Sequence, residues 1–145
     1  MRNPVFLINV AALILISASA HSQNIEAKIT GLRSKQGQVF IKVYKDEKSF
    51  ADDKPFLIKK FAKTAMSNSE MLVKFSLDPG TYGLALLDDE NSDSEMNYNF
   101  LGMPQEGFGF SNYELKGLSR PKLNDFRIVV NANSKQKVNI KVTYL

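Results

Sequence analysis

Apolar and polar side chains alternate with a period of two residues along much of the chain. In residues 24–30 every second side chain is apolar, and the same pattern returns in residues 38–44, 71–77 and 137–144. This alternation is typical of strands that bury one face and leave the other in solvent. We therefore predict four half-buried strands.

Three further segments complete the predicted set of strands. Residues 81–87 are apolar on both faces, which indicates a strand that is covered on both sides. Residues 55–62 and 126–130 are short and extended in character, whereas the polar residues 45–54 could hold one helical turn. Seven short strands separated by turn signals, with no helical periodicity over ten residues, predict an all-β sandwich.

A long irregular segment, residues 98–124, interrupts this regular spacing and is rich in Gly and aromatic residues. Loops longer than about 15 residues are uncommon and are often functional. Phe108, Phe110 and Tyr113 could form a stacking surface for a sugar ring or an apolar ligand. The alternative is that these rings close one end of the sandwich core.

An acidic, Asn-rich loop, residues 88–97, follows the apolar strand. Its oxygen-bearing side chains alternate in a way that can converge on one hard cation such as Ca²⁺. At position 6 of such a loop Gly usually allows the sharp turn, but Ser94 stands here, and Phe100 replaces the bidentate Glu at position 12. The alternative is a solvated acidic turn. The candidate metal ligands are Asp89, Asn91, Asp93, Glu95 (through its carbonyl oxygen) and Asn97.

The first 20 residues have the pattern of a signal peptide. Arg2 precedes an apolar run at residues 5–16, and Ala-Ser-Ala at residues 18–20 resembles a cleavage site. The apolar run is shorter than the ~20 residues that span a bilayer. We therefore predict one periplasmic or secreted β-sandwich domain, residues 21–145, with no membrane insertion after cleavage.

The residue types present narrow the possible chemistry. The chain has no Cys, and its one His is His21 at the predicted mature terminus, so Ser-His-Asp and Cys-His catalysis and the usual zinc sites are excluded. Carboxylate chemistry or a Lys-based nucleophile remains, and a carboxylate pair such as Asp88 with Glu106 could serve a hydrolase that acts on an exported polymer. No basic cluster interleaved with aromatic residues is present, so we expect no nucleic-acid partner.

Several motifs resemble a family of exported bacterial proteins called domain of unknown function 2141. The resemblance rests on D-P-G-T-Y at residues 78–82, D-E-N at residues 89–91 and the run from Asn99 to Asn112, N-F-L-G-M-P-Q-E-G-F-G-F-S-N. It implies an immunoglobulin-like or transthyretin-like sandwich outside the cytoplasm, with no established activity. The acidic loop of the family is similar to D-x-N-x-N-G-x-x-D, which Asp89 and Asn91 match.

Three functions are compatible with these observations. The first is a non-enzymatic binding or structural module that Ca²⁺ stabilises at the acidic loop, with an envelope protein or a glycan as its partner. The second is a small-ligand or glycan-binding protein that uses the aromatic loop, and the third is the carboxylate-dependent hydrolase.

Overall fold

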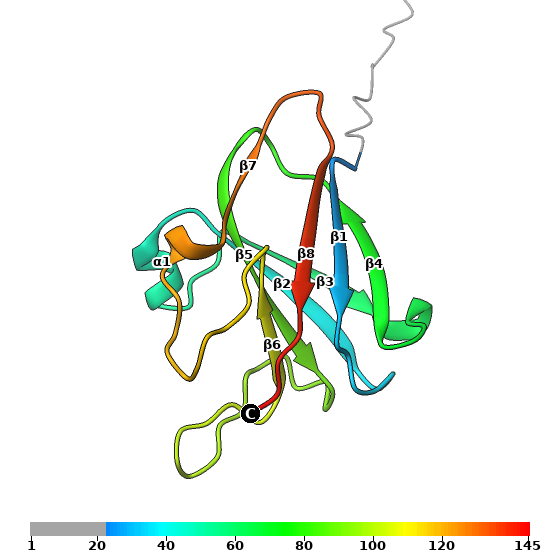
Figure 1. Cartoon of the computed structure of the whole chain (residues 1–145), viewed down its shortest axis with the longest axis vertical. Coiled ribbons are helices and arrows are strands. Elements are labelled where there is room, and N and C mark those ends of the chain that lie inside the picture. Colours follow the sequence, from blue (N-terminus) through cyan, green and yellow to red (C-terminus); the bar gives the residue numbers. More distant parts are fainter. Residues whose placement is uncertain (1–22) are drawn as a thin grey trace, which may run out of the picture.

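The computed structural model describes residues 23–145, which form two β-sheets packed face to face (Figure 1). The smaller sheet has the order β4-β1-β8. Its strands are β1 (Ile25–Thr30), β4 (Glu70–Phe75) and β8 (Gln136–Lys141). β1 pairs antiparallel with β4 and parallel with β8. The predicted signal peptide lies outside the described residues.

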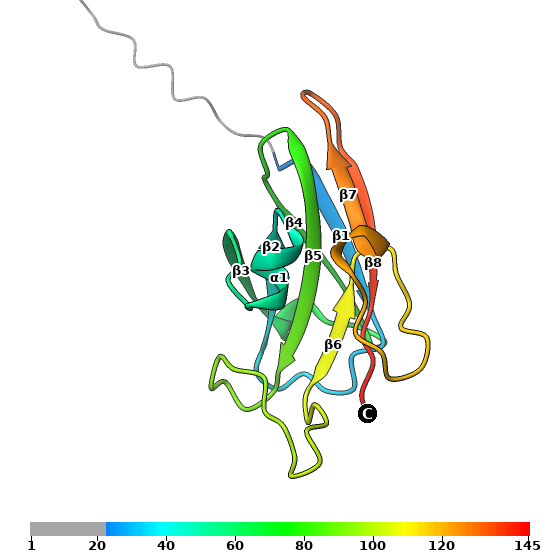
Figure 2. The same ribbon diagram turned by 90° about the vertical axis from the view of Figure 1, so that its left-hand side faces the viewer.

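The larger sheet is antiparallel and is built around β5 (Gly80–Asp89), its longest strand. Along one edge β5 pairs with β2 (Gln38–Tyr44), which in turn pairs with β3 (Leu57–Ala62). Along the other edge its first half pairs with β7 (Arg127–Val130) and its second half with β6 (Gly107–Phe110). The edge-on view in Figure 2 shows β5 running the length of the molecule toward the loop that follows it.

The core fills the space between the two sheets, because each strand turns its apolar positions inward. β4 follows the alternation most regularly, with every second residue buried. β5 is buried on both faces over most of its length, as its continuous apolar run predicts. The fully buried members of this core include Ala27, Ile29, Val39, Ile41, Val43, Leu84 and Ile140.

A second, smaller apolar cluster covers the outer face of the larger sheet. It is closed by α1 (Glu47–Ala51), where the predicted helical turn forms, and by the 3₁₀ turn η2 (Leu123–Phe126). The side chain of Asp46 caps α1 by accepting the Ser49 N–H at 2.8 Å. Another 3₁₀ turn, η1 (Lys63–Ala65), follows β3. The cluster consists of Tyr44, Phe50, Phe110, Leu123 and Phe126.

The all-β sandwich is confirmed, with eight strands in residues 23–145. The additional strand is β6, which lies inside the segment predicted to be irregular. Its pattern is Gly-Phe-Gly-Phe, and Gly is depleted in strands, so propensity favoured a loop. Pairing with the second half of β5 imposes the extended backbone. No helix in the described part of the chain has the length and apolar character needed to cross a membrane.

Candidate cation site and the neighbouring groove

The end of β5 places consecutive acidic residues on opposite faces of the sheet. The Asp88 carboxylate is fully buried and forms an ion pair with the equally buried Lys63 ammonium. Lys63 also donates to the Ser34 carbonyl at 3.1 Å, and the Tyr144 hydroxyl donates to Asp88 at 2.5 Å. A Cβ atom on Gly107 would meet the Tyr144 ring at 2.4 Å, so only glycine allows this packing.

Glu90 is also neutralised by a neighbouring cation. Its carboxylate accepts three hydrogen bonds from Arg33, at 3.1, 3.1 and 2.7 Å, and one from the Ser34 hydroxyl at 2.8 Å. The hydrogen bonds from Arg33 are the main cause that holds the pKa of Glu90 below its ordinary value. The charges on both sides of Asp89 are therefore balanced.

Asp89, Asp93 and Glu106 bring three carboxylates together. One oxygen from each lies within 4.8 Å of the others. Asp89 is held by the backbone N–H groups of Asp93 and Ser94, at 3.1 and 3.2 Å, and by the Gln38 amide at 3.3 Å. Within residues 23–145, no Lys or Arg forms an ion pair with any of the three.

Glu106 is the least compensated member of this cluster. Only 5% of the residue is exposed, and neither carboxylate oxygen has a hydrogen-bond partner. Burial and then the charge of Asp89 raise its pKa, while the backbone N–H groups of Asn97 and Asn91 offset part of the rise. A buried carboxylate in this setting is costly unless a cation approaches it.

This arrangement is suited to a hard divalent cation. Two oxygens that both lie about 2.4 Å from one Ca²⁺ can be separated by at most about 4.8 Å, which the three carboxylates already satisfy. Carboxylate oxygens are also the ligands that Ca²⁺ prefers. The cluster therefore brings three carboxylate oxygens close to the spacing that one ion requires.

The sequence-predicted ligands fall into two groups. Asp89 and Asp93 belong to the carboxylate cluster. Asn91 and Asn97 hydrogen-bond to Asp93 Oδ2 through their amide nitrogens, both at 2.9 Å, and the exposed Glu95 donates its backbone N–H to Asp93 at 2.9 Å. Their amides thus surround Asp93 with donors, whereas their oxygens would have to turn toward an ion to bind it.

The sharp turn of this loop forms without glycine. Ser94 has a φ of +69° and Ser92 has a φ of +60°, both in the left-handed region that L-residues seldom adopt. The Asp89 carboxylate, which accepts the Ser94 N–H, holds this conformation. The substitution of Gly by Ser at position 6 therefore leaves the turn in place.

Glu106 was not predicted as a ligand because it lies 17 positions after Asp89, beyond the reach of any local loop motif. The available signal was a single carboxylate immediately before an aromatic and glycine run. Strand β6 pairs with β5 in a register that sets Gly107 opposite Asp88, which carries the preceding Glu106 to the acidic end of β5.

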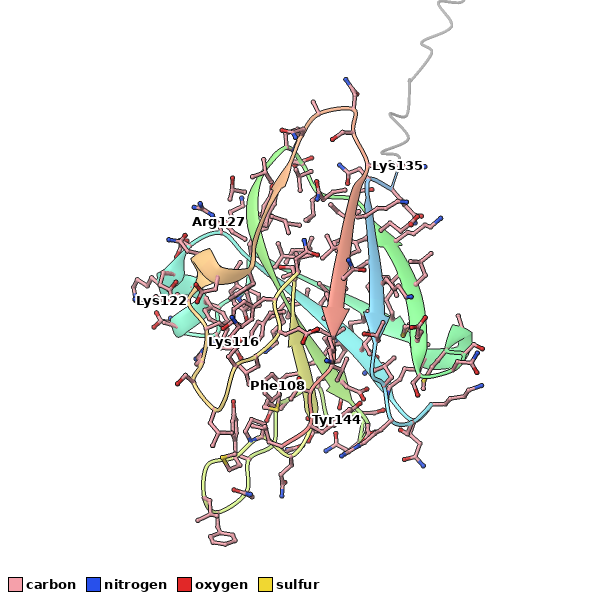
Figure 3. All side chains as sticks on the ribbon, viewed as in Figure 1. Phe108, Lys116, Lys122, Arg127, Lys135 and Tyr144 are labelled. Atoms are coloured by element: carbon pink, nitrogen blue, oxygen red, sulfur yellow. The ribbon has the colours of Figure 1, made fainter. Side chains whose placement is uncertain are left out.

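The aromatic residues of the predicted ligand site lie on the outer face of the same sheet. Phe110 is buried against Phe50 and Phe126, at centroid distances of 6.1 and 4.9 Å. Phe108 is half-buried and, with Phe110, lines a groove of about 410 Å³. Tyr113 is half-buried, meets Phe110 edge-on and does not line the groove. Figure 3 shows Phe108 and Tyr144 in the half of the molecule away from Lys135.

The carboxylates of the hydrolase alternative have separate partners. Asp88 is held by Lys63 and Tyr144 away from solvent, and Glu106 is directed toward Asp89 and Asp93. The hydrolase with Asp88 and Glu106 stays an untested prediction.

These features define a cysteine-free, all-β sandwich with a carboxylate cluster at the end of its central strand. The chain belongs to a family described as an uncharacterized protein conserved in bacteria, DUF2141, whose pattern it matches over residues 27–139. The resemblance noted from the motifs is thereby confirmed. No curated protein and no solved structure matches the chain.

Proposed function

We propose that the protein is an exported, non-enzymatic binding module that is stabilised by Ca²⁺ at Asp89, Asp93 and Glu106. The observation that carries the proposal is the Glu106 carboxylate, which is buried, has no hydrogen-bond donor and lies beside two other carboxylates. A divalent cation is the simplest group that would contact all three carboxylates at once and offset most of their charge.

The distribution of cations in the fold supports this assignment. Asp88 has Lys63 and Glu90 has Arg33, so the protein supplies a counter-ion to each neighbour of Asp89. The carboxylates of the cluster have none among the described residues. The coordination geometry also favours Ca²⁺ over Mg²⁺. Ca²⁺ accepts six to eight oxygen ligands in irregular geometry, whereas Mg²⁺ demands a near-ideal octahedron. The oxygens of Asn91 and Asn97 and water would complete the coordination.

Export is proposed from the first 20 residues, whose pattern is that of a signal peptide. Extracellular Ca²⁺ modules typically bind with Kd values of about 10⁻⁴–10⁻³ M, and we expect this range here. An envelope protein or a glycan is the proposed partner. Mass analysis of the protein recovered from the envelope should give a chain that begins at His21; a full-length, cytoplasmic chain would contradict export.

Calorimetric titration of the chelator-treated protein with Ca²⁺ tests the ion directly. We expect one site per chain and weaker binding of Mg²⁺. Glu106→Gln removes one negative ligand with little change of shape and should weaken Ca²⁺ binding at least tenfold. The matched control is Glu114→Gln, because Glu114 is exposed and, among residues 23–145, its one ion pair is with Lys141, at 3.3 Å.

The two variants separate the proposed site from general charge effects. If both variants lose the same Ca²⁺ affinity, binding depends on the overall charge of the protein, and the proposed site is wrong. If millimolar Ca²⁺ gives no heat of binding and no change in thermal stability, the protein does not bind Ca²⁺ and the proposal is wrong.

A further inference from the structure

The groove on the outer face of the larger sheet has an apolar floor. Ala85 of β5 and Phe108 and Phe110 of β6 face away from the core between the sheets and form part of that floor. The loop before β6 and the segment after it add further lining residues, among them Met96 and Leu118. A volume of about 410 Å³ lies within the range of small-molecule sites.

The rim of the groove exposes large apolar side chains. Tyr98 is 61% exposed and Leu118 is 71% exposed. Met96 and Met103 also line the groove, and methionine side chains adapt readily to irregular apolar ligands. An apolar guest would cover this surface and remove it from water.

One end of the groove is polar and carries a net positive charge. Lys42 bonds both oxygens of Asp53, at 3.0 and 2.8 Å, and the Tyr44 hydroxyl donates to the same carboxylate at 2.5 Å. The charges of Lys42 and Asp53 therefore cancel, and the Tyr44 hydroxyl has a hydrogen-bond acceptor. Arg120 adds a second cation; it stacks over the Phe50 ring at 4.2 Å and donates one N–H to the Phe50 carbonyl at 2.6 Å.

We propose that this groove binds a small amphipathic monoanion, with its acyl or aromatic body on Ala85 and Phe108 and its carboxylate on Arg120. Lys42 and Arg120 against Asp53 leave one positive charge in excess at one end of an apolar groove. A ligand with an apolar body and one negative charge complements this arrangement. A glycan would need polar partners along its whole length, but the polar groups of the groove lie at one end and are mostly paired with each other. This proposal does not depend on the cation site.

Decanoate, below its micellar concentration, is the probe that we choose. Methyl NMR spectra of the methionine-labelled mature protein report binding without any substitution. The Met96 and Met103 signals should shift in a saturable manner, whereas those of Met66 and Met71, which belong to the core between the sheets, should not move. Decyltrimethylammonium, with the opposite charge, should bind at least tenfold more weakly.

Two variants and one control locate the site. Arg120→Gln removes the cation and Ala85→Leu fills the floor, and each should weaken decanoate binding at least tenfold. Arg127→Gln, at an exposed position of β7 outside this groove, should change decanoate binding less than twofold. Thermal unfolding of each variant checks that the fold is retained.

Three outcomes would overturn the proposal. Equal binding of the two detergents would reduce the groove to a general apolar surface. Shifts at Met66 and Met71 together with Met96 and Met103 would indicate loosening of the fold. Saturable shifts with an oligosaccharide, but none with decanoate, would assign the groove to a glycan.

Discussion

At the scale of single residues, the carboxylates of the acidic loop differ in their hydrogen-bond environment. Asp93 is surrounded by donors: the backbone N–H of Glu95 is the largest cause that lowers its pKa, followed by the side chain of Asn97. Neither carboxylate oxygen of Glu106 has a hydrogen-bond partner, and burial is the main cause that raises its pKa. Both residues lie in one cluster, so a bound ion would contact both. Its effect on the free energy of unfolding would be larger at Glu106 than at Asp93.

Ser94 carries backbone strain that a substitution can relieve. A left-handed conformation costs an L-residue about 1–2 kcal/mol, whereas glycine adopts it freely but loses more entropy on folding. We expect Ser94→Gly to stabilise the protein by about 0.5–1 kcal/mol, as measured by urea denaturation in the presence of chelator. Ser119→Gly is the control, because Ser119 is exposed and has no positive φ, so it should gain nothing. A loss of stability in Ser94→Gly would mean that its hydroxyl is required.

At the scale of elements, the end of β5 depends on the buried pair between Lys63 and Asp88. Removal of one partner of such a pair leaves an unpaired buried charge and typically costs 3–5 kcal/mol. We expect Lys63→Met to lower the free energy of unfolding by about that amount, as measured by urea denaturation. The double variant Lys63→Met, Asp88→Asn should recover a large part of the loss. Equal stability of the single variant and the unmodified protein would contradict the pairing.

Hydrogen bonds from β2 to Asp53, which lies between α1 and β3, predict a dependence of stability on pH. Burial raises the pKa of Asp53, but hydrogen bonds from Lys42 and Tyr44 together outweigh it and hold the pKa below the ordinary value of 3.8. A lowered pKa in the folded state gives stability that is present above the ordinary pKa and is lost as the pH falls through the folded value. Asp53→Asn should therefore lose more stability at pH 7 than at pH 3, as measured by thermal unfolding. An equal loss of stability at pH 7 and pH 3 would contradict the hydrogen bonds from Lys42 and Tyr44 to the Asp53 carboxylate.

Period-two alternation predicted four of the eight strands, and a continuous apolar run and two short extended segments predicted three more, because each of these strands packs apolar side chains against the core between the sheets. It could not predict β6, whose extended backbone is imposed by pairing with β5. The acidic loop was predicted from local spacing, and Asp89 and Asp93 do lie together. Glu106 joins them through strand register, which is a long-range property that spacing does not encode.

At the scale of the whole molecule, one loop joins the cation site to the groove. Asp93 lies near its start and Glu106 at its end, and Met96, Tyr98 and Met103 in between line the groove. An ion that ties Asp93 to Glu106 would restrict the loop and fix this part of the groove. Ligands that favour the same conformation strengthen each other's binding by the same factor.

This linkage predicts that Ca²⁺ raises the affinity for decanoate about fivefold or more, within the usual range of coupling. Calorimetric titration with decanoate, in chelator and in saturating Ca²⁺, measures the change. Glu106→Gln should reduce the effect of Ca²⁺ on decanoate binding while it retains the binding seen in chelator. If decanoate binds equally in both conditions, the two sites are independent, and each proposal then stands on its own test.

Thermal unfolding of the mature protein and of Glu106→Gln, each in chelator and in Ca²⁺, tests the central claim most directly. In chelator the variant should be more stable by about 1 kcal/mol, because its neutral amide no longer repels Asp89 and Asp93 and can donate to them. In Ca²⁺ at about 100 times its Kd, the unmodified protein should gain about 2.7 kcal/mol, whereas a variant that binds tenfold more weakly should gain only about 1.4 kcal/mol. If Ca²⁺ stabilises the two proteins equally, or stabilises neither, the three carboxylates do not form a cation site.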